Sequence, residues 1–247
     1  MSNKIYKALA PYYDRLMADV NYKAWVEYIK NICALNHLEP KTIFDLGCGT
    51  GTTALQLLEK EYDVIGLDGS IEMLNVAKEK LHHYNPSLIL GRFECFAIRK
   101  KVDLAISLFD SLNNLIQESE LLNAFKCVEN SLVRKGLFIF DMNTIYGLSQ
   151  MNSSSTFTKD NNGTYSIWKS NYNRAKCITT LYLTLFVSEN GYYRRVEETH
   201  IERGYSLTTI KKLLMRSGFT GICFYEHPTF RKPNSRTRRV MVVARKD

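Results

Sequence analysis

The residues with the clearest chemistry are three glycines at a spacing of two, Gly47, Gly49 and Gly51, which follow closely on Asp45. Without side chains, the backbone can turn sharply there, and a flat ligand group can lie directly against main-chain atoms. Asp68 comes 21 residues after Gly47 and can accept hydrogen bonds from both hydroxyl groups of a ribose. The third glycine comes one residue too early for a dinucleotide-binding pattern, and no Gly-Lys-Ser/Thr follows as in a P-loop. The spacing therefore predicts a site for a nucleoside, with nothing built to hold a pyrophosphate.

The sequence around these residues alternates between short apolar runs and stretches with helical periodicity. This alternation predicts a parallel sheet that is covered by helices on both faces. The glycine run and Asp68 both follow predicted strands, and open α/β sheets bind their ligands at this carboxyl edge. The predicted strands are 42–46, 63–68, 87–90, 102–108 and 136–141, and the predicted helices are 52–61, 71–84 and 118–132.

The chain changes character after Asn143. Residues 149–163 are rich in Ser, Thr and Asn and are expected to form a loop. Three stretches that alternate apolar and polar residues follow, and they predict an antiparallel meander. These stretches are 165–172, 178–187 and 192–201.

The α/β pattern returns after the meander, with a predicted helix at 207–217 and two predicted strands at 221–226 and 239–244. Residues 2–36 are expected to form two helices, because Pro11 and the stretch 19–21 break an otherwise helical periodicity. The chain is therefore expected to contain an α/β domain, residues 1–143 and 206–247, and an inserted antiparallel β subdomain, residues 144–205.

The run Asp45–Gly51 followed by Asp68 resembles the first two motifs of the class I S-adenosylmethionine-dependent methyltransferases, and the resemblance covers roughly residues 40–145. It implies a doubly wound, Rossmann-like seven-stranded sheet, S-adenosyl-L-methionine as the cofactor, and methyl transfer to a nitrogen or oxygen of a small-molecule substrate. The inserted subdomain is then expected to cover the active site and select the substrate. An RNA methyltransferase and a protein that binds the cofactor without turnover are the two alternatives.

The resemblance also assigns roles to individual residues. The backbone of Gly47, Cys48 and Gly49 is expected to line the methionine part of the cofactor, while Asp45 orders the loop. Asp68 takes the ribose hydroxyls. The complete set of expected cofactor-binding residues is Tyr13, Asp45, Gly47, Cys48, Gly49, Gly51, Asp68, Gly69, Met73, Arg92, Phe93, Leu108 and Phe109.

One position departs from the family pattern. Where the family usually has an acid that binds the adenine amino group, this chain has Arg92, which offers no hydrogen-bond acceptor. Arg92 could stack on the adenine, with Phe93 contributing a backbone N–H, or Glu94 could take the place of the missing acid.

Three residues are candidates for the reacting end of the site. Asp110 belongs to the motif that lies beside the transferable methyl group in the family, although it also suits a helix N-cap. Tyr13 resembles the lid tyrosine of small-molecule methyltransferases, and a tyrosine face suits a sulfonium cation. His200 shares a predicted strand face with Glu198 and Glu202, whose carboxylates would tune it as an acid or base. The alternative for His200 is a solvated polar sheet face.

Charge and cysteine usage limit the class of protein. Residues 201–247 hold 11 basic and 3 acidic residues, whereas residues 1–200 hold 22 of each, so the net charge of +8 lies in the last part of the chain. Arg236, Arg238 and Arg239 suit an acidic or phosphorylated substrate, and RNA is a less favoured partner. Six cysteines without zinc spacing predict buried, reduced thiols and no metal. No apolar run reaches membrane-spanning length, so we expect a soluble protein. The reduced thiols favour the cytoplasm, and either a monomer or a homodimer is expected.

Overall fold

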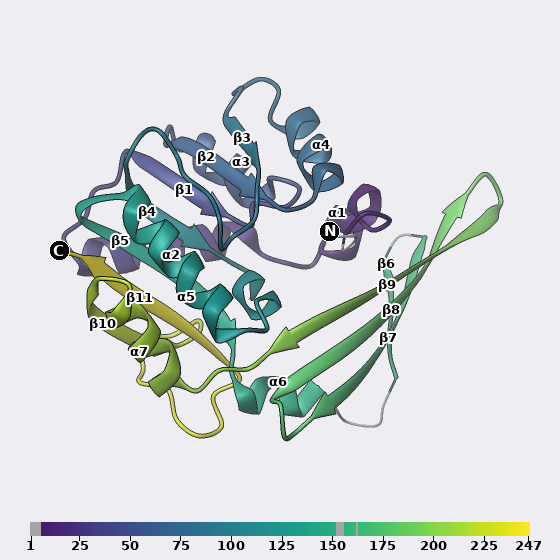
Figure 1. The fold of residues 1–247 in the computed structure, drawn as a ribbon. Coiled ribbons are helices and arrows are strands. Elements are labelled where there is room, and N and C mark those ends of the chain that lie inside the picture. The colour runs from purple at the N-terminus through teal and green to yellow at the C-terminus, as the bar shows by residue number, and fades with distance from the viewer. Residues whose placement is uncertain (1–5, 152–155, 162) are drawn as a thin grey trace.

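A computed structural model describes residues 6–151, 156–161 and 163–247, and these form two β-sheets (Figure 1). The larger sheet has seven strands in the order β10-β11-β5-β4-β1-β2-β3. The five strands β1 to β5 are parallel, and β11 is antiparallel to both of its neighbours. The expected doubly wound, Rossmann-like sheet is therefore confirmed, and its order reverses between β1 and β4. The strands are β1 (Thr42–Leu46), β2 (Asp63–Asp68), β3 (Ser87–Leu90), β4 (Val102–Ser107), β5 (Leu132–Asn143), β10 (Phe219–Glu226) and β11 (Arg239–Lys246).

Helices cover both faces of the larger sheet. Neighbouring residues of a strand point to opposite faces, so Ile43 and Phe44 of β1 belong to different apolar cores. The core around Ile43 includes residues of α2, α3 and α4, whereas the core around Phe44 includes residues of α5 and α7. These helices are α2 (Tyr22–Leu35), α3 (Thr52–Leu58), α4 (Ile71–Lys80), α5 (Glu118–Ser131) and α7 (Leu207–Arg216).

The second sheet has four antiparallel strands in the order β6-β7-β8-β9 and extends to one side of the larger sheet (Figure 1). It is an inserted subdomain, because the chain enters it after β5 through α6 and returns from it to α7. The three predicted strands of the meander are present and are longer than expected. The elements are α6 (Ile145–Met151), β6 (Phe157–Asn161), β7 (Thr164–Asn173), β8 (Ile178–Glu189) and β9 (Tyr192–Arg203).

The expected loop at 149–163 is wrong in part. Its first residues belong to α6, and 157–161 form the edge strand β6; residues 152–155 and 162 lie outside the described ranges. β6 is defined by its pairing with β7, in which Phe157 lies opposite Trp168. A short edge strand has a partner on one side only, so it needs little of the apolar alternation by which strands are predicted.

An N-terminal segment, residues 6–16, packs across the inner face of the second sheet. It contains a turn followed by η1 (Ala10–Tyr12) and α1 (Tyr13–Leu16), in place of the first of the two helices expected over residues 2–36. Its side chains form a third apolar core with β8 and β9. The members of this core are Leu9, Tyr12, Leu16, Leu183, Leu185, Val187 and Val196.

The two connections between the sheets are tied together by Asn113, which is fully buried. Its Nδ2 donates to the backbone oxygens of Asn143 at 3.1 Å and Arg203 at 2.8 Å. Its Oδ1 accepts from the backbone N–H of Asn143 at 2.9 Å. Next to Arg203, a Cβ on Gly204 would come within 2.9 Å of the Cα of Ile145, so the second connection packs directly on the first. These contacts fix where the second sheet leaves the first.

Two further expectations concern the whole chain. Of the six cysteines, Cys33 and Cys48 are buried as expected, but Cys95 and Cys223 are exposed; all six are free. Cys95 and Cys223 lie outside the well-packed helix faces, where a small apolar neighbourhood in sequence does not ensure burial. Within the described ranges, no helix is both long and apolar enough to span a membrane.

Candidate active site

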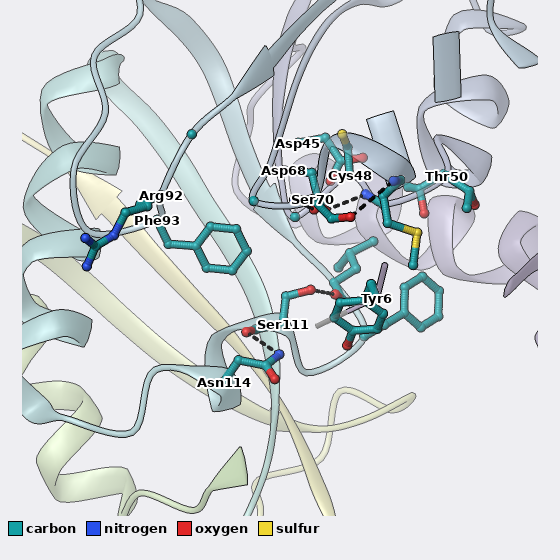
Figure 2. A pocket seen from close by; sticks show the side chains of 18 of the residues that line it. Tyr6, Asp45, Cys48, Thr50, Asp68, Ser70, Arg92, Phe93, Ser111 and Asn114 are labelled. Carbon is teal, nitrogen blue, oxygen red and sulfur yellow. Dashed lines mark hydrogen bonds between the residues drawn. The ribbon is translucent and has the colours of Figure 1, made fainter. Parts of the chain in front are cut away.

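A cavity of about 570 Å³ opens at the carboxyl ends of β1, β2 and β4 (Figure 2). Its walls come from the glycine run, the end of β2, residues 90–94, residues 108–116 and the N-terminal segment. Of the expected cofactor-binding residues, all except Gly51 line it. The cavity lies where the strand order of the sheet reverses, which is the position at which doubly wound sheets bind ligands.

The glycine run takes a backbone path that other residues rarely adopt. Gly47, Gly49 and Gly51 have φ values of +86°, +54° and +78°. A Cβ on Gly47 would come within 2.9 Å of the Oγ of Ser111, whereas one on Gly49 would meet no atom within 4 Å. Gly51 packs away from the cavity, because a Cβ there would lie 2.9 Å from the Cδ1 of Leu81 on α4. The loop thus exposes bare main chain at Gly47 and Gly49, and Gly51 allows close helix packing.

Asp68 is held rigidly at the end of β2. Its Oδ2 accepts from the backbone N–H of Gly49 at 2.9 Å, and its Oδ1 accepts from the backbone N–H of Ser70 at 2.8 Å. Burial raises the pKa of Asp68, against the lowering effect of these backbone hydrogen bonds. Each oxygen keeps a lone pair beyond its backbone partner, so the carboxylate can accept two hydroxyl groups from the cavity.

Asp45 offers an acceptor without a partner. Its side chain is 2% exposed, and its Oδ2 is buried with no hydrogen bond among the described residues. Burial, followed by the charge of Asp68, raises the pKa of Asp45 to about 7. A buried acceptor without a donor is unfavourable, so a ligand that brings an N–H group to this point would be bound tightly.

The part of the cavity where the adenine is expected is lined by apolar residues on one side and by charged residues on the other. Met73 is buried, and the ring of Phe93 faces the cavity across from Asp68 (Figure 2). Arg92 donates through Nε to the Oε1 of Glu94 at 2.6 Å, and its side chain is 72% exposed. Figure 2 shows its guanidinium directed away from Phe93 and the cavity. Whether Arg92 or Glu94 meets the adenine therefore stays a prediction.

The segment after β4 has an unusual backbone beside the cavity. Phe109 and Asp110 are both left-handed, with φ values of +58° and +52°. This conformation is uncommon for residues other than glycine, and it is held by a hydrogen bond from the backbone N–H of Asp110 to the Oδ2 of Asp141 at 3.0 Å. Phe109 then lines the cavity. Asp110 occupies the N-cap position of the short helix η2 (Ser111–Asn114), in line with the N-cap alternative, but its side chain makes no capping hydrogen bond.

Three carboxylates and one guanidinium form a cluster next to this segment, named here the acid cluster: Asp110, Asp141, Glu202 and Arg239. Nη2 of Arg239 lies 2.6 Å from the Oδ1 of Asp110, and its Nη1 is paired with Asp141. The Oε2 of Glu202 accepts from the Nδ2 of Asn143 at 3.2 Å. Burial, followed by the charge of Asp110, raises the pKa of Glu202 to about 8. Burial likewise raises the pKa of Asp141 to about 6, against the effect of Arg239.

Tyrosines of the N-terminal region form part of the cavity wall, and the charges of the acid cluster act on one of them. Tyr6, Tyr13 and Tyr22 all line the cavity. The ring of Tyr6 lies 6.0 Å from that of Tyr13, edge on, and 4.7 Å from that of His200. Burial is the main cause of the raised pKa of Tyr6, and the charges of Asp110, Glu202 and Asp68 add to it. The Tyr6 phenol is thus within electrostatic reach of both the cluster and Asp68.

His200 and Asp110, two of the three expected catalytic residues, do not line the cavity, whereas Tyr13 does. His200 is 5% exposed, and its Nε2 lies 3.2 Å from the Oε2 of Glu198. The catalytic roles of all three stay predictions. Sequence reasoning missed other lining residues because they carry no motif spacing; for Tyr6, the only signal was its helical spacing from Tyr13. The missed residues include Tyr6, Tyr22, Thr50, Ser70, Ser111, Asn114, Leu115, Ile116 and Glu120. In the part of the chain that the structure describes, no group of His, Cys, Asp and Glu could hold a metal ion.

Comparison with known proteins places this site in a family. Residues 43–136 match the model of a methyltransferase domain. YqeM of Bacillus subtilis (strain 168), whose name calls it a methyltransferase and gives no substrate, is 28% identical over 98% of this chain and 97% of its own. The crystal structure of an S-adenosylmethionine-dependent methyltransferase from Clostridium acetobutylicum ATCC 824 is 31% identical, covers 98% of both chains and superposes with a TM-score of 0.87. The sugar N-methyltransferase KedS8 from Streptoalloteichus sp ATCC 53650, 16% identical over 92% of this chain and 88% of its own, shares the fold with a TM-score of 0.77. The chain belongs to the class I S-adenosylmethionine-dependent methyltransferases.

Proposed function

We propose that this enzyme transfers the methyl group of S-adenosylmethionine to the amine nitrogen of a small molecule. The observation that carries the choice of an amine is the acid cluster, which holds three carboxyl groups and one guanidinium. None of its four residues lines the cavity, but the charges of Asp110 and Glu202 act on Tyr6, which does. An acceptor that arrives as an ammonium ion would compensate the excess negative charge, whereas a hydroxyl group would leave it unbalanced.

The cavity has the features that the cofactor requires. Asp68 would accept the two ribose hydroxyls, and the bare main chain at Gly47 and Gly49 leaves room for the methionine part. The orphan Oδ2 of Asp45 would accept a hydrogen bond from the cofactor's amino group, directly or through water. Met73 and Phe93 offer apolar walls for the adenine. These assignments follow the expected set, with Gly51 acting through loop packing.

An acidic or phosphorylated acceptor, the other substrate class suggested by the basic end of the chain, fits the geometry less well. Of the three arginines expected to bind it, Arg239 is already paired with Asp110 and Asp141. Arg236 and Arg238 are exposed and do not line the cavity. The charged groups that act on Tyr6 in the cavity wall are instead the carboxyl groups of Asp110, Glu202 and Asp68.

The protein's own part in the reaction is to align, to exclude water and to receive a proton. When bound, the cofactor supplies a methyl group already activated as a sulfonium. Asp110 and Glu202 would hold the acceptor's ammonium group. An ammonium has no lone pair, so it must lose a proton first. Glu202 would receive this proton at Oε1, the oxygen that Asn143 leaves free, in its ionised form, which becomes populated as the pH rises toward about 8. The rings of Tyr6 and Tyr13 would wall off this space from water and present π-faces to the sulfonium.

The inserted sheet, residues 144–205, is proposed as the subdomain that selects the acceptor. Glu202 lies at the end of β9, and Asn113 fixes that end against the larger sheet. KedS8, a structural neighbour, is titled a sugar N-methyltransferase. At 16% identity that likeness concerns the fold alone, so the proposal depends on the acid cluster.

The test is a matched substrate screen. The enzyme is incubated with S-adenosylmethionine and pairs of small molecules that differ only in carrying an amine or a hydroxyl group, and S-adenosylhomocysteine release and product mass are measured. Turnover restricted to the amine member of a pair is the expected result. Equal or greater turnover of the hydroxyl member would overturn the choice of nitrogen. Binding of the cofactor with no turnover of any pair or of RNA would favour a protein that only binds the cofactor.

A further inference from the structure

Glu198 of β9 binds the backbone of the N-terminal segment at several points. Its Oε2 accepts from the N–H of Tyr6 at 2.8 Å, and its Oε1 accepts from the N–H groups of Ala8 at 3.0 Å and Leu9 at 2.9 Å. The Glu198 side chain is 6% exposed. Burial alone would raise the pKa of Glu198, but hydrogen bonds from His200 and from the backbone of Tyr6 and Leu9 bring it below its ordinary value. The carboxylate is therefore charged at neutral pH and holds three donors that no helix or strand would otherwise satisfy.

These hydrogen bonds decide where Tyr6 lies. Tyr6 has a φ of +68°, a conformation that is strained for a residue with a side chain. The bond from its N–H to Glu198 holds the backbone in this shape, and the Tyr6 ring packs on His200, the second partner of Glu198. The ring thereby forms part of the cavity wall beside Tyr13.

The other end of the N-terminal segment is tied to the cofactor loop. The Oδ1 of Asp14 accepts from the Oγ1 of Thr50 at 2.6 Å, and its Oδ2 lies 2.8 Å from the Nζ of Lys80. Thr50 stands between Gly49 and Gly51 in the glycine run. One short segment thus runs from the inserted sheet to the loop expected to hold the cofactor, with Tyr6 and Tyr13 between its two attachments.

The segment shares an apolar core with the inserted sheet. Leu9 and Leu16 share a core with Leu185 of β8, and the hydroxyl of Tyr12 donates to the Oε1 of Glu189 at 2.7 Å. Apolar contact is non-directional and would allow the segment to slide along the sheet. The carboxylate of Glu198 is the directional contact that sets its register.

We infer that Glu198 is a positioning residue: it holds the N-terminal segment closed over the cavity, so that Tyr6 and Tyr13 wall the reacting end of the site and retain the bound cofactor. The inference goes beyond the proposed function, because it holds for any methyl acceptor. His200 contributes by its contact with Glu198 and by packing against the ring of Tyr6.

The test uses Glu198→Gln, which keeps the size of the side chain, together with Glu198→Ala. Glu197→Gln is the matched control, because Glu197 is the preceding residue on β9 and its side chain is 57% exposed and paired with Arg195. Ala8→Pro removes one N–H donor and leaves the carboxylate in place, so it tests the same contact if the Glu198 variants do not fold. Two quantities are measured: amide hydrogen exchange at residues 6–16 and the dissociation rate of S-adenosylhomocysteine.

Exchange at the amides of Tyr6, Ala8 and Leu9 is expected to be at least about tenfold faster in Glu198→Gln. The substitution removes the negative charge, and the glutamine keeps one acceptor oxygen, so its NH2 group faces a backbone N–H that has lost its partner. Dissociation of S-adenosylhomocysteine is expected to be about tenfold faster as well, larger still in Glu198→Ala, and unchanged in Glu197→Gln. Unchanged exchange would show that the segment is held by apolar contacts alone, and faster exchange with unchanged dissociation would show that it does not retain the cofactor. Either result overturns the inference. Neither measurement involves a methyl acceptor, so failure of the proposed amine specificity would leave both results standing.

Discussion

The two ends of the cavity are built in different ways. At the cofactor end, the contacts are local: the backbone N–H of Gly49 binds Asp68 from 19 residues away, and that of Ser70 from two. In the region proposed to bind the methyl acceptor, here called the acceptor end, they are long-range: Arg239 reaches Asp141 across 98 residues and Glu198 reaches Tyr6 across 192. The first end follows from one strand–loop–helix unit and its neighbouring strand. The second exists only after the inserted sheet, the last strand and the N-terminal segment have come together.

This difference has an energetic side. The cofactor end presents main-chain donors and one orphan acceptor, Asp45, which a ligand can satisfy without disturbing the protein. The acceptor end instead holds a buried ion-pair cluster, whose carboxylates depend on Arg239 for their charge balance. We therefore expect substitutions at the acceptor end to affect the stability of the protein and those at the cofactor end to affect mainly ligand affinity.

The largest expected effect is that of Arg239→Met. Removing one partner of a buried ion pair leaves its charge uncompensated and costs about 3 kcal/mol. For a chain of this size, that lowers the thermal midpoint by roughly 10 °C, measured by calorimetry or circular dichroism. Arg238→Met is the matched control, because Arg238 is the preceding residue and is exposed. An equal loss of stability in both variants, or none in Arg239→Met, would remove the contrast between the two ends.

Asp68→Ala tests the cofactor end. Two ribose hydroxyls would lose a charged acceptor, at about 1.5 kcal/mol each, which corresponds to an affinity for S-adenosylmethionine about 100-fold weaker by titration calorimetry. Asp63→Ala is the control, because Asp63 lies at the opposite end of β2 and its side chain is 57% exposed. Thermal unfolding of both variants checks that the fold is kept. Unchanged affinity in Asp68→Ala would mean that another group binds the ribose.

The same contrast explains what the sequence could predict. Glycine spacing and the position of Asp68 depend on local backbone geometry, so the fold, the family and the part of the cavity wall around the glycine run and Asp68 were predictable. The pairing of Arg239 with Asp110 was not, because nothing in a sequence relates a loop residue to a strand at the other end of the chain. Without knowledge of that pairing, the arginines of residues 236–239 suggested a site for an acidic substrate.

His200 and Tyr6 illustrate the limit on a finer scale. The strand periodicity placed Glu198, His200 and Glu202 on one face, which the β8–β9 register is consistent with. Periodicity gives no information about what lies opposite that face. The structure places Tyr6 and the backbone of the N-terminal segment there, so Glu198 is committed to backbone hydrogen bonds and Glu202 is the carboxylate left near the acceptor end.

Glu202→Gln sharpens the comparison at the acceptor end. The pKa of Glu202 is about 8, above its ordinary value of 4.5, so its carboxylate becomes charged only as the pH rises through about 8. A quaternary ammonium analogue of the acceptor, whose own charge does not change with pH, should therefore bind about tenfold more tightly at pH 9 than at pH 7. In Glu202→Gln this rise is expected to be lost, while the affinity for S-adenosylmethionine is kept.

Stability should respond in the opposite direction. The folded state binds the Glu202 proton more tightly than the unfolded state does, because the folded-state pKa is about 8 and the unfolded one about 4.5. The contribution of Glu202 to the free energy of unfolding is therefore fully present below about pH 4.5 and is lost progressively as the pH rises to about 8. The groups that act on Glu202 are Asp110, Asp141, Arg239 and the amide of Asn143. Glu202→Gln is expected to flatten this part of the stability curve, measured as the free energy of unfolding in denaturant. A rise in analogue binding that persists in Glu202→Gln would show that Glu202 is not the group whose ionisation controls binding.

The smallest expected effect is that of the double substitution of Arg236→Ala and Arg238→Ala. Both side chains are exposed, neither lines the cavity, and charges in that position are screened by salt. The KM for a small amine is therefore expected to change by less than about twofold. If the natural acceptor were RNA, the same substitution would weaken its binding and reduce the dependence of affinity on salt concentration, because fewer phosphate contacts would be made. If the double variant binds RNA as weakly as the parent and with the same salt dependence, Arg236 and Arg238 take no part in substrate binding. Substrate selection would then depend on the acid cluster.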